Sequence, residues 1–411
     1  MELSGRPTRL SRVEESRPGQ RVRRPTILTT NANRLRVLIL NWRDIRHHRA
    51  GGAEVMTHGY ARNLVRHGHA VTLFSSAVPG LPVEETIEGI TVVRRGGAVT
   101  TRIHAPRWYR EQQRRGRDFD VVIEEINTLP YFAGRFASVP IVLWVHQIAR
   151  EVWWYEAPKP LGALGYGLEQ AYLRLLRRSS ALVPSESTRG DLLRLGFRED
   201  RVLVVPNAVD HVEAPPVEKE PGLLAYVGRI TSSKRIDHLI RALALVRDQR
   251  LDVRLLVAGP GREDERARLF ALARDLGVAD RFDLRGHLDE GAKRRLLASA
   301  SLVLMASVRE GWGLVVTEAN ALGTPAVVYD RPGLRDSTVN ERTGLITQPS
   351  PEALAAAIGR ALTDSRLYER LSSGAAAWAA GFTWSKSNDL FERAVLAVAD
   401  RRPLPIADPR A

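Results

Sequence analysis

The sequence predicts an α/β protein built from two Rossmann-like domains in tandem. Short runs rich in Val, Ile and Leu alternate with segments of helical periodicity, which is typical of parallel sheets covered by helices on both faces. The alternation stops at the polar, Pro-rich stretch HVEAPPVEKEPG (211–222) and then starts again. A chain of 411 residues is long enough for two separate cores, so we expect two domains joined by a linker.

The first domain is expected to span residues 35–210. Short apolar runs bounded by turn residues predict its buried strands. These runs are RVLILN (36–41), AVTLFS (70–75), VVIEEIN (121–127), IVLWVHQ (141–147) and ALVPSES (181–187). A helix is expected after the first strand, because Gly51 and Gly52 precede apolar residues at helical spacing.

The second domain is expected to span residues 223–383 and to repeat the pattern. Its predicted strands are LLAYVGR (223–229), RLLVAGPG (254–261), FDLRGHL (282–288), LVLMAS (302–307) and PAVVYD (325–330). The run that starts at Leu314 predicts a helix ending near Gly323, and the last helix is predicted at 384–400. Ligands of such sheets bind at the carboxyl ends of strands, so the cleft between two such domains is the expected site.

Composition narrows the function classes. The chain has no cysteine, which excludes disulfides, thiol catalysis and thiolate metal sites and fits a cytoplasmic location. No apolar run is long enough to suggest a membrane span. Residues 1–34 are rich in Arg, Pro, Ser and Thr and are interpreted as a disordered basic arm. The formal net charge of +14 favours anionic partners, although a general bias toward arginine explains it equally well.

The segment EGWGLVVTE (310–318) follows a predicted strand, which places Glu310 at a carboxyl strand end. Gly311 and Gly313 let the backbone approach a ligand closely, and the free N–H groups of the following helix favour an anion. Glu318 would lie one turn into that helix, near a ligand edge. A glutamate that only favours a helix start is the alternative. The missing third glycine of a dinucleotide fingerprint argues against hydride chemistry.

The loop YVGRITSSKR carries two cations after another predicted strand. Arg229 and Lys234 could face the same cleft, and lysine is scarce in this sequence. Arginine grips phosphate through two N–H groups and lysine acts as a point charge, so the pair could neutralise a diphosphate. Ser232 or Ser233 is expected to cap the following helix. A solvated basic turn is the alternative.

In the first domain, the Gly51-Gly52 turn before a helix suits a phosphate or a sugar hydroxyl. His146 ends a predicted strand and could bond a sugar hydroxyl, although a lone histidine is more often structural. No residue pattern predicts a metal site.

The ordered set GGAE, HQ, SES-T, VPNAVD, GR-x4-K and E-x7-E resembles family 4 glycosyltransferases, the bacterial glycosyl transferase group 1 enzymes. The similarity runs from about residue 34 to 395. It implies the GT-B fold, in which two Rossmann-like domains face each other across a cleft and the C-terminal helix (384–400) packs back toward the first domain. It also implies a retaining enzyme that uses a nucleotide sugar and no cofactor or metal.

The resemblance implies four catalytic residues. Arg229 and Lys234 match the pair that binds the donor diphosphate, and Glu310 matches the glutamate that contacts the donor sugar near the reaction centre. His146 matches the histidine near the C6 hydroxyl of that sugar. The histidine is followed here by QIAREVWWYEAP, which departs from many relatives and leaves the acceptor open.

The resemblance also implies a donor-binding set. Glu318 matches the ribose-binding glutamate, the first-domain glycines match a loop over the diphosphate, and the base would pack near Gly286. The set comprises Gly51, Gly52, Gly228, His287, Leu288, Gly311, Trp312, Gly313, Leu314 and Glu318. The expected partners are therefore a nucleoside-diphosphate sugar and a hydroxyl acceptor, which could be a glycan, a lipid-linked sugar or a small natural product.

Three other interpretations stay open. An epimerase-like or phosphorylase-like enzyme would share the architecture, but the sequence offers no clear extra acids, bases or cofactor lysine for it. A non-catalytic binder of anions or nucleic acid would use the positive charge, and we regard nucleic acid as an improbable partner. Finally, LEQAYLRLLRR (168–178) has apolar and basic residues at helical spacing and could face an acidic membrane at the inner surface. A packed surface helix fits this segment equally well.

Overall fold

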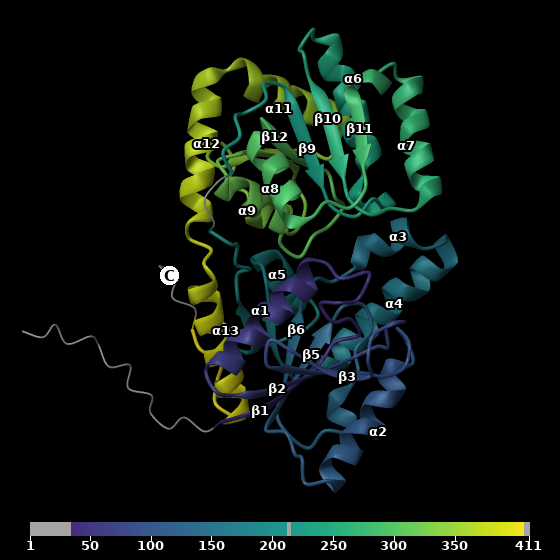
Figure 1. Cartoon of the computed structure of the whole chain (residues 1–411), viewed down its shortest axis with the longest axis vertical. Coiled ribbons are helices and arrows are strands. Elements are labelled where there is room, and N and C mark those ends of the chain that lie inside the picture. The colour runs from purple at the N-terminus through teal and green to yellow at the C-terminus, as the bar shows by residue number, and fades with distance from the viewer. Residues whose placement is uncertain (1–33, 212–214, 407–411) are drawn as a thin grey trace, which may run out of the picture. The chain divides into compact units, whose positions relative to one another are not determined.

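The computed structural model describes residues 34–211 and 215–406, and it confirms an α/β protein with two sheets of mainly parallel strands (Figure 1). Internal contacts group the chain from Leu35 onward into one unit. The basic arm expected at 1–34 falls outside the described residues except for Arg34.

The first sheet has eight strands in the order β3-β4-β2-β1-β5-β6-β7-β8, all parallel to their neighbours except the β3–β4 hairpin. Its strands are β1 (Arg36–Leu40), β2 (Ala70–Ser75), β3 (Glu84–Ile87), β4 (Ile90–Arg94), β5 (Val121–Ile126), β6 (Ile141–Val145), β7 (Ser180–Val183) and β8 (Val202–Val204). The helices of this half are α1 (Gly52–Arg66), α2 (Thr101–Arg114), α3 (Trp153–Glu156), α4 (Lys159–Leu176) and α5 (Glu186–Arg194). The central strands read as almost continuous apolar runs because both faces of the sheet are covered.

The second sheet has six parallel strands in the order β11-β10-β9-β12-β13-β14. Its strands are β9 (Leu223–Val227), β10 (Arg254–Ala258), β11 (Phe282–Arg285), β12 (Leu302–Met305), β13 (Ala326–Tyr329) and β14 (Gly344–Thr347). The helices of this half are α6 (Ile236–Asp248), α7 (Glu263–Asp275), α8 (Glu290–Ser299), α9 (Leu314–Ala321), α10 (Leu334–Ser337), α11 (Pro351–Thr363) and α12 (Ser365–Ala379). The order reverses between β9 and β12, and such a switch point is where ligands of open sheets bind.

The last helix, α13 (Trp384–Ala399), packs back on the first half of the chain, as expected for the GT-B fold. It lies beside α1 in Figure 1. The Phe391 ring stacks on the Tyr60 ring with their centroids 4.2 Å apart, and both side chains are buried. Glu392 accepts a hydrogen bond from Asn63 of α1 at 3.0 Å. The C-terminal helix is therefore part of the first core.

Two local expectations need correction or extension. The serines after β9 do not cap the next helix, because Ser232–Lys234 form a short 3₁₀ turn and α6 begins only at Ile236. The Ser233 hydroxyl lies 3.2 Å from the Thr231 hydroxyl and is already engaged. The sequence analysis also omitted β3, β4, β8 and β14.

The division into domains stays a prediction. The last strand of the first sheet ends at Val204 and the first strand of the second begins at Leu223, so the predicted boundaries fall between the sheets. Part of the predicted linker, 212–214, lies outside the described residues.

Candidate active site

Three loops meet backbone to backbone at the carboxyl ends of β9, β10 and β11. The N–H of Gly228 donates to the carbonyl of Ala258 at 2.9 Å, and that of Gly259 donates to the carbonyl of Gly286 at 3.0 Å. A Cβ at Gly259 would lie 1.9 Å from the Gly228 carbonyl oxygen, so no larger residue fits there. The predicted donor-binding residue Gly228 thus lies at this edge. His287 and Leu288 follow Gly286 directly, the first exposed and the second partly packed on the core.

An ion pair joins the loops after β9 and β12, which are neighbouring strands. The Lys234 Nζ donates to Oε1 of Glu310 at 2.6 Å, and the Ser307 hydroxyl donates to the same oxygen at 2.7 Å. Both charged side chains are 13% exposed. The N–H of Val308 also donates to the Ser233 carbonyl at 2.9 Å, which fixes one loop against the other. The structure therefore brings together two residues that the sequence analysis placed near the reaction centre.

Arg229 is exposed at the start of the β9 loop and faces a second arginine. Burial lowers the pKa of the Arg43 guanidinium, Glu54 opposes this shift, and the positive charge of Arg229 lowers the pKa further. Arg43 lies in the loop after β1, where Glu54 accepts from its Nε at 2.9 Å and pairs with its Nη2 at 2.8 Å. Two cations from the two sheets thus lie close to each other. The sequence analysis missed Arg43, although its place after a strand was a usable signal.

The glycines before α1 reach the beginning of α9. A Cβ at Gly52 would lie 2.5 Å from Cδ1 of Leu314, and the N–H of Gly51 donates to Glu54 Oε2 at 2.8 Å. Among the described residues, no side chain caps α9, whose first turn follows Gly313 in a left-handed conformation with φ +99°. Uncapped N–H groups at a helix start favour an anion. Gly52 thus lies close to the start of α9, and the donor-binding role of Gly51, Gly52, Gly313 and Leu314 stays a prediction.

His146 directly follows β6 and lies close to the Gly311 backbone, since a Cβ at Gly311 would lie 2.0 Å from the His146 carbonyl oxygen. The histidine is buried, and its Nε2 lies 3.0 Å from Oε2 of Glu125 and 3.3 Å from the Thr57 hydroxyl. Glu125 therefore fixes the orientation of the imidazole ring. The sequence analysis missed Glu125 because it reads there as part of a buried strand.

The Trp312 side chain is not part of this cluster. It is buried, its indole N–H donates to the Thr317 hydroxyl at 3.4 Å, and its ring packs edge-on against Phe382 at 5.1 Å. Aromatic area of this size is stabilising when it is buried in a core. Trp312 can thus offer a ligand only its backbone.

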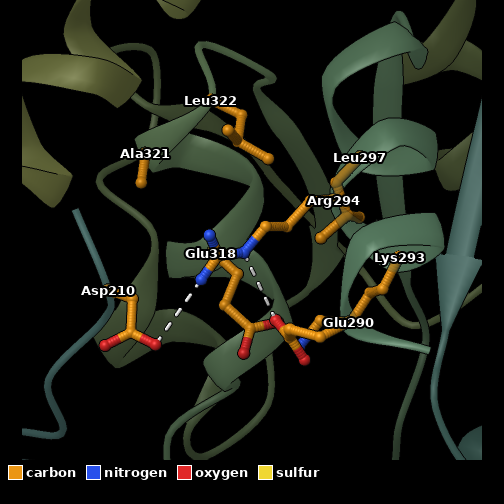
Figure 2. A pocket seen from close by; sticks show the side chains of 8 residues that line it. All are labelled: Asp210, Glu290, Lys293, Arg294, Leu297, Glu318, Ala321 and Leu322. Atoms are coloured by element: carbon orange, nitrogen blue, oxygen red, sulfur yellow. Dashed lines mark ion pairs between the residues drawn. The ribbon is translucent and has the colours of Figure 1, made fainter. Parts of the chain in front are cut away.

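Glu318 lies in a separate hollow between α8 and α9 (Figure 2). The hollow is lined by Asp210, Glu290, Lys293, Arg294, Leu297, Glu318, Ala321 and Leu322. Glu318 Oε2 forms an ion pair with the Lys293 Nζ at 3.0 Å but accepts no hydrogen bond from the part of the chain that the structure describes. Burial raises the pKa of the Glu318 carboxyl, and Lys293 partly opposes that shift. A buried carboxylate oxygen without a hydrogen bond can accept one from a ligand hydroxyl.

Lys293 and its neighbours were not predicted as site residues. The Lys293 Nζ also pairs with Glu290 at 3.1 Å, and Arg294 reaches Asp210 at 3.5 Å. Burial opposes the charge on Lys293, but Glu318 and Glu290 raise its pKa above the usual value. The scarcity of lysine was a signal that applied to this position as well as to Lys234.

Arg309, directly before Glu310, anchors the loop after β12 to the first half of the chain. Its side chain is 5% exposed, and it donates to Asp191 at 2.5 Å and to Glu151 at 2.7 Å. The N–H of Ser233 donates to Glu156 at 3.1 Å, so the β9 loop is held in the same way. Acidic side chains from the α3 and α5 regions thus hold the loops after β9 and β12.

Within residues 34–211 and 215–406, no group of three or more His, Asp or Glu side chains is arranged to hold a metal ion. No helix of the same residues is both long and apolar enough to cross a bilayer.

Comparisons with known proteins agree with these observations. Residues 50–213 match the family described as Glycosyltransferase Family 4, and residues 210–378 match glycosyl transferases group 1. A D-inositol 3-phosphate glycosyltransferase from Frankia alni is 30% identical over 82% of this chain and 92% of its own length. An uncharacterised glycosyltransferase from Methanocaldococcus jannaschii is 28% identical over 76% of this chain and 86% of its own length.

Solved structures share the fold at low identity. Sucrose-phosphate synthase from Thermosynechococcus elongatus aligns with a TM-score of 0.75 and 19% identity, over 87% of this chain and 98% of that one. HepE from Anabaena, solved with UDP and glucose, aligns with a TM-score of 0.67 and 19% identity over the same shares. Since both halves of the sequence match family profiles and a relative at 30% identity spans both, the chain belongs to the family 4 glycosyltransferases of the GT-B fold, which transfer a sugar from a nucleotide sugar.

Proposed function

We propose that this glycosyltransferase moves a sugar from a nucleoside-diphosphate sugar to a hydroxyl acceptor with retention of anomeric configuration and without a metal. The observation that carries the proposal is the 2.6 Å pair of Lys234 and Glu310 at the carboxyl ends of neighbouring strands. A cation is needed where the diphosphate departs, and a carboxylate is suited to the hydroxyls of the transferred sugar. Both are held in place before a ligand binds.

The leaving diphosphate would lie among Arg229, Lys234, Arg43 and the start of α9. Arginine and lysine side chains with free helical N–H groups stabilise negative charge that develops in the transition state. The close approach of Gly52 to Leu314 brings the α1 loop over the same point.

The nucleoside would lie over the carboxyl ends of β9 to β11. Glu318 would accept hydrogen bonds from the ribose, since its Oε2 is buried without one. Lys293 would keep Glu318 ionised. The base would pack near Gly286, His287 and Leu288, and the backbone from Gly311 to Leu314 would bind sugar hydroxyls.

The transfer step is proposed as a front-face substitution. The bond from the anomeric carbon to the diphosphate oxygen breaks, the acceptor oxygen bonds to the same face of that carbon, and the acceptor proton moves to the leaving phosphate oxygen. Two carboxylates of the site are already engaged: Glu310 by Lys234 and Ser307, and Glu125 by Thr57 and His146. This favours hydrogen-bonding roles for both over attack on the sugar.

The first test is calorimetric titration of UDP, GDP, ADP and dTDP into the wild type. UDP is the first candidate because HepE, a neighbour in fold, was solved with it. Glu318→Ala should weaken binding of the selected nucleotide by about tenfold or more, since hydrogen bonds to a charged group contribute about 1.5–3 kcal/mol. Glu263→Ala is the control, because that side chain is 93% exposed in α7.

No binding of any nucleoside diphosphate by the folded wild type would refute the donor site and leave the anion-binding alternative. If one binds, NMR of the products of donor hydrolysis and transfer decides the rest. A transferred sugar with inverted configuration would refute retention, and an epimerised donor without transfer would identify the epimerase-like alternative.

A further inference from the structure

The outer face of α4 exposes a continuous stripe of leucines. Leu161, Leu164, Leu168 and Leu175 recur at helical spacing and are 59%, 57%, 50% and 69% exposed. Isolated exposed apolar residues need no explanation, but an aligned stripe of this length is unusual on a protein surface. The opposite face of α4 is packed, with Leu173 fully buried.

The α3 helix packs on another side of α4 than the leucines. Trp154 and Tyr155 of α3 are 47% and 40% exposed, but the Trp154 ring lies 5.8 Å from the Tyr166 ring, and the Arg235 guanidinium lies 5.5 Å from the centre of the Tyr155 ring. The preceding Trp153 fixes α3 on α4, because a Cβ at Gly165 would lie 2.5 Å from its ring and one at Gly162 would lie 2.7 Å from its carbonyl oxygen. The α3–α4 face, defined here as the four leucines of the α4 helix that α3 holds in place, is thus an apolar surface on a fixed helix pair.

The exposed charged side chains of α4 and of the two residues after it are all basic, whereas α3 ends in the exposed Glu156. Exposed basic residues lie at both ends of α4, and within the described residues none of them forms an ion pair: Lys159, Arg174, Arg177 and Arg178. The one acidic side chain of α4 is Glu169, which is 1% exposed and accepts N–H groups of Ala149 and Arg150 at 2.7 and 2.6 Å. An apolar stripe bordered by unpaired cations is complementary to a surface of acyl chains below anionic headgroups.

The same segment contacts the donor-side loops. Glu156, at the end of α3, accepts from Ser233 beside Lys234, and Glu151 pairs with Arg309 beside Glu310. A partner bound to the α3–α4 face would therefore lie next to elements that hold the donor site.

We propose that the α3–α4 face docks on the surface of an anionic lipid bilayer. The leucines enter the boundary between headgroups and acyl chains, and the arginines at the end of α4 pair with lipid phosphates. The docking surface uses none of the proposed donor-binding residues, so it can be tested separately from catalysis.

The test is cosedimentation of the full chain with vesicles of phosphatidylglycerol and phosphatidylcholine, and with phosphatidylcholine alone. The wild type should bind the anionic vesicles more tightly, and salt should weaken that binding. Replacing Arg174, Arg177 and Arg178 with Gln should weaken binding about fivefold per arginine, from the about 1 kcal/mol that each basic residue contributes near such a surface. The control with equal charge change replaces Arg241, Arg342 and Arg366 with Gln, all exposed in the second half of the chain.

The apolar part of the face is tested by replacing Leu161, Leu164 and Leu168 with Ser. Binding should fall by about tenfold or more, because burying each exposed leucine is worth about 1–2 kcal/mol. The matched control replaces three exposed apolar residues elsewhere, Val83, Val99 and Ile103, which are 60%, 65% and 57% exposed. Thermal midpoint and nucleoside diphosphate binding should stay unchanged in all four variants.

Absence of vesicle binding by the wild type would overturn the proposal. So would equal losses in the α4 variants and their controls, since binding would then depend on total charge or on residues 1–33. A dimer that the Leu→Ser variant abolishes, in a wild type that does not bind vesicles, would assign the face to a second copy of the chain instead.

Discussion

Replacing Lys234 with Met is the sharpest test of the proposed chemistry. Methionine keeps an unbranched side chain of similar reach and removes only the charge that pairs with Glu310 at 2.6 Å. The expected result is a loss of about 10²–10³ in kcat, because removing one preorganised group that stabilises transition-state charge costs about 2.7–4 kcal/mol.

A Coulomb estimate gives a loss of transition-state stabilisation of the same size. A unit cation about 4 Å from a unit of developing negative charge contributes about 4 kcal/mol at an effective dielectric constant of 20, which suits a site whose side chains are 13% exposed. The variant also leaves Glu310 with only the Ser307 hydroxyl as a donor. Its free energy of unfolding should therefore fall by about 1–3 kcal/mol, the cost of an unsatisfied buried polar group.

The assay is steady-state transfer or donor hydrolysis with the nucleotide sugar selected by calorimetry, together with a thermal melt. Lys219→Met is the matched control, because the Lys219 ammonium donates to the Ala300 carbonyl at 3.0 Å in the same half but contacts no predicted site residue. Lys219→Met should change stability and leave kcat within about threefold. A folded Lys234→Met enzyme with nearly wild-type kcat would refute the role assigned to this lysine.

Three further predictions concern stability and pH. Arg309→Met should lower the free energy of unfolding by about 3 kcal/mol in chemical denaturation, because it leaves the buried Asp191 without one of its cations; an unchanged midpoint would contradict a stabilising pair. Burial, together with the charge of neighbouring cations, lowers the pKa of His47 from 6.5 to about 4. The unfolded chain therefore binds a proton at His47 more readily than the folded protein does, so the stability that this histidine contributes above pH 6.5 is lost as the pH falls toward 4. His47→Asn should remove that part of the acid destabilisation measured by melting at stepwise pH, and an unaltered pH profile would show that other groups dominate. Phe391→Ala should lower the free energy of unfolding by about 3–5 kcal/mol, because it removes a 2% exposed ring that stacks on Tyr60 in the first core. A decrease below about 1 kcal/mol would mean that α13 is not an integral part of that core.

The sequence alone predicts those site residues that lie in a loop directly after a recognisable strand. Glu310, Lys234 and Gly313 each follow a β-branched run, and the rule that ligands meet carboxyl strand ends brings them together without further information. The central strands were found for the same reason, since a strand buried on both faces is an apolar run.

Residues that act across the fold were missed. Lys293 lies one helix away from Glu318 in sequence, and only the packing of α8 against α9 shows that the two meet at 3.0 Å. Glu125 looks like any residue of a strand until β5 and β6 pair and bring it to His146. Trp312 belongs to the donor set that the resemblance implies, and burial of its ring against Phe382 leaves its backbone for that role, which stays a prediction.

The β3–β4 hairpin was missed for a different reason. Its turn residues, Glu88 and Gly89, have φ values of +48° and +84°, which are typical of a tight hairpin turn. Asn-Gly or Asp-Gly at these positions would have predicted the turn more clearly. Glutamate rarely adopts positive φ, so the pair gave a weak turn signal. Its strands are also short and β3 is only partly buried, which leaves little hydrophobic pattern to recognise.

The distribution of charge suggests why the two halves of the chain need a ligand between them. Arg43 and Arg229 approach from the two sheets, and the positive charge of Arg229 lowers the pKa of Arg43. Glu54 compensates Arg43, and Glu310 compensates Lys234, but within the described residues Arg229 has no carboxylate partner. A diphosphate would supply the missing negative charge at the point where cations of both halves and the start of α9 converge.

The loop that carries Glu310 is held by the ion pair between Arg309 and Asp191, independently of any ligand. The carboxylate that would meet the sugar is thus positioned by the protein alone, whereas the cations that would meet the phosphates are fully compensated only when the donor is bound.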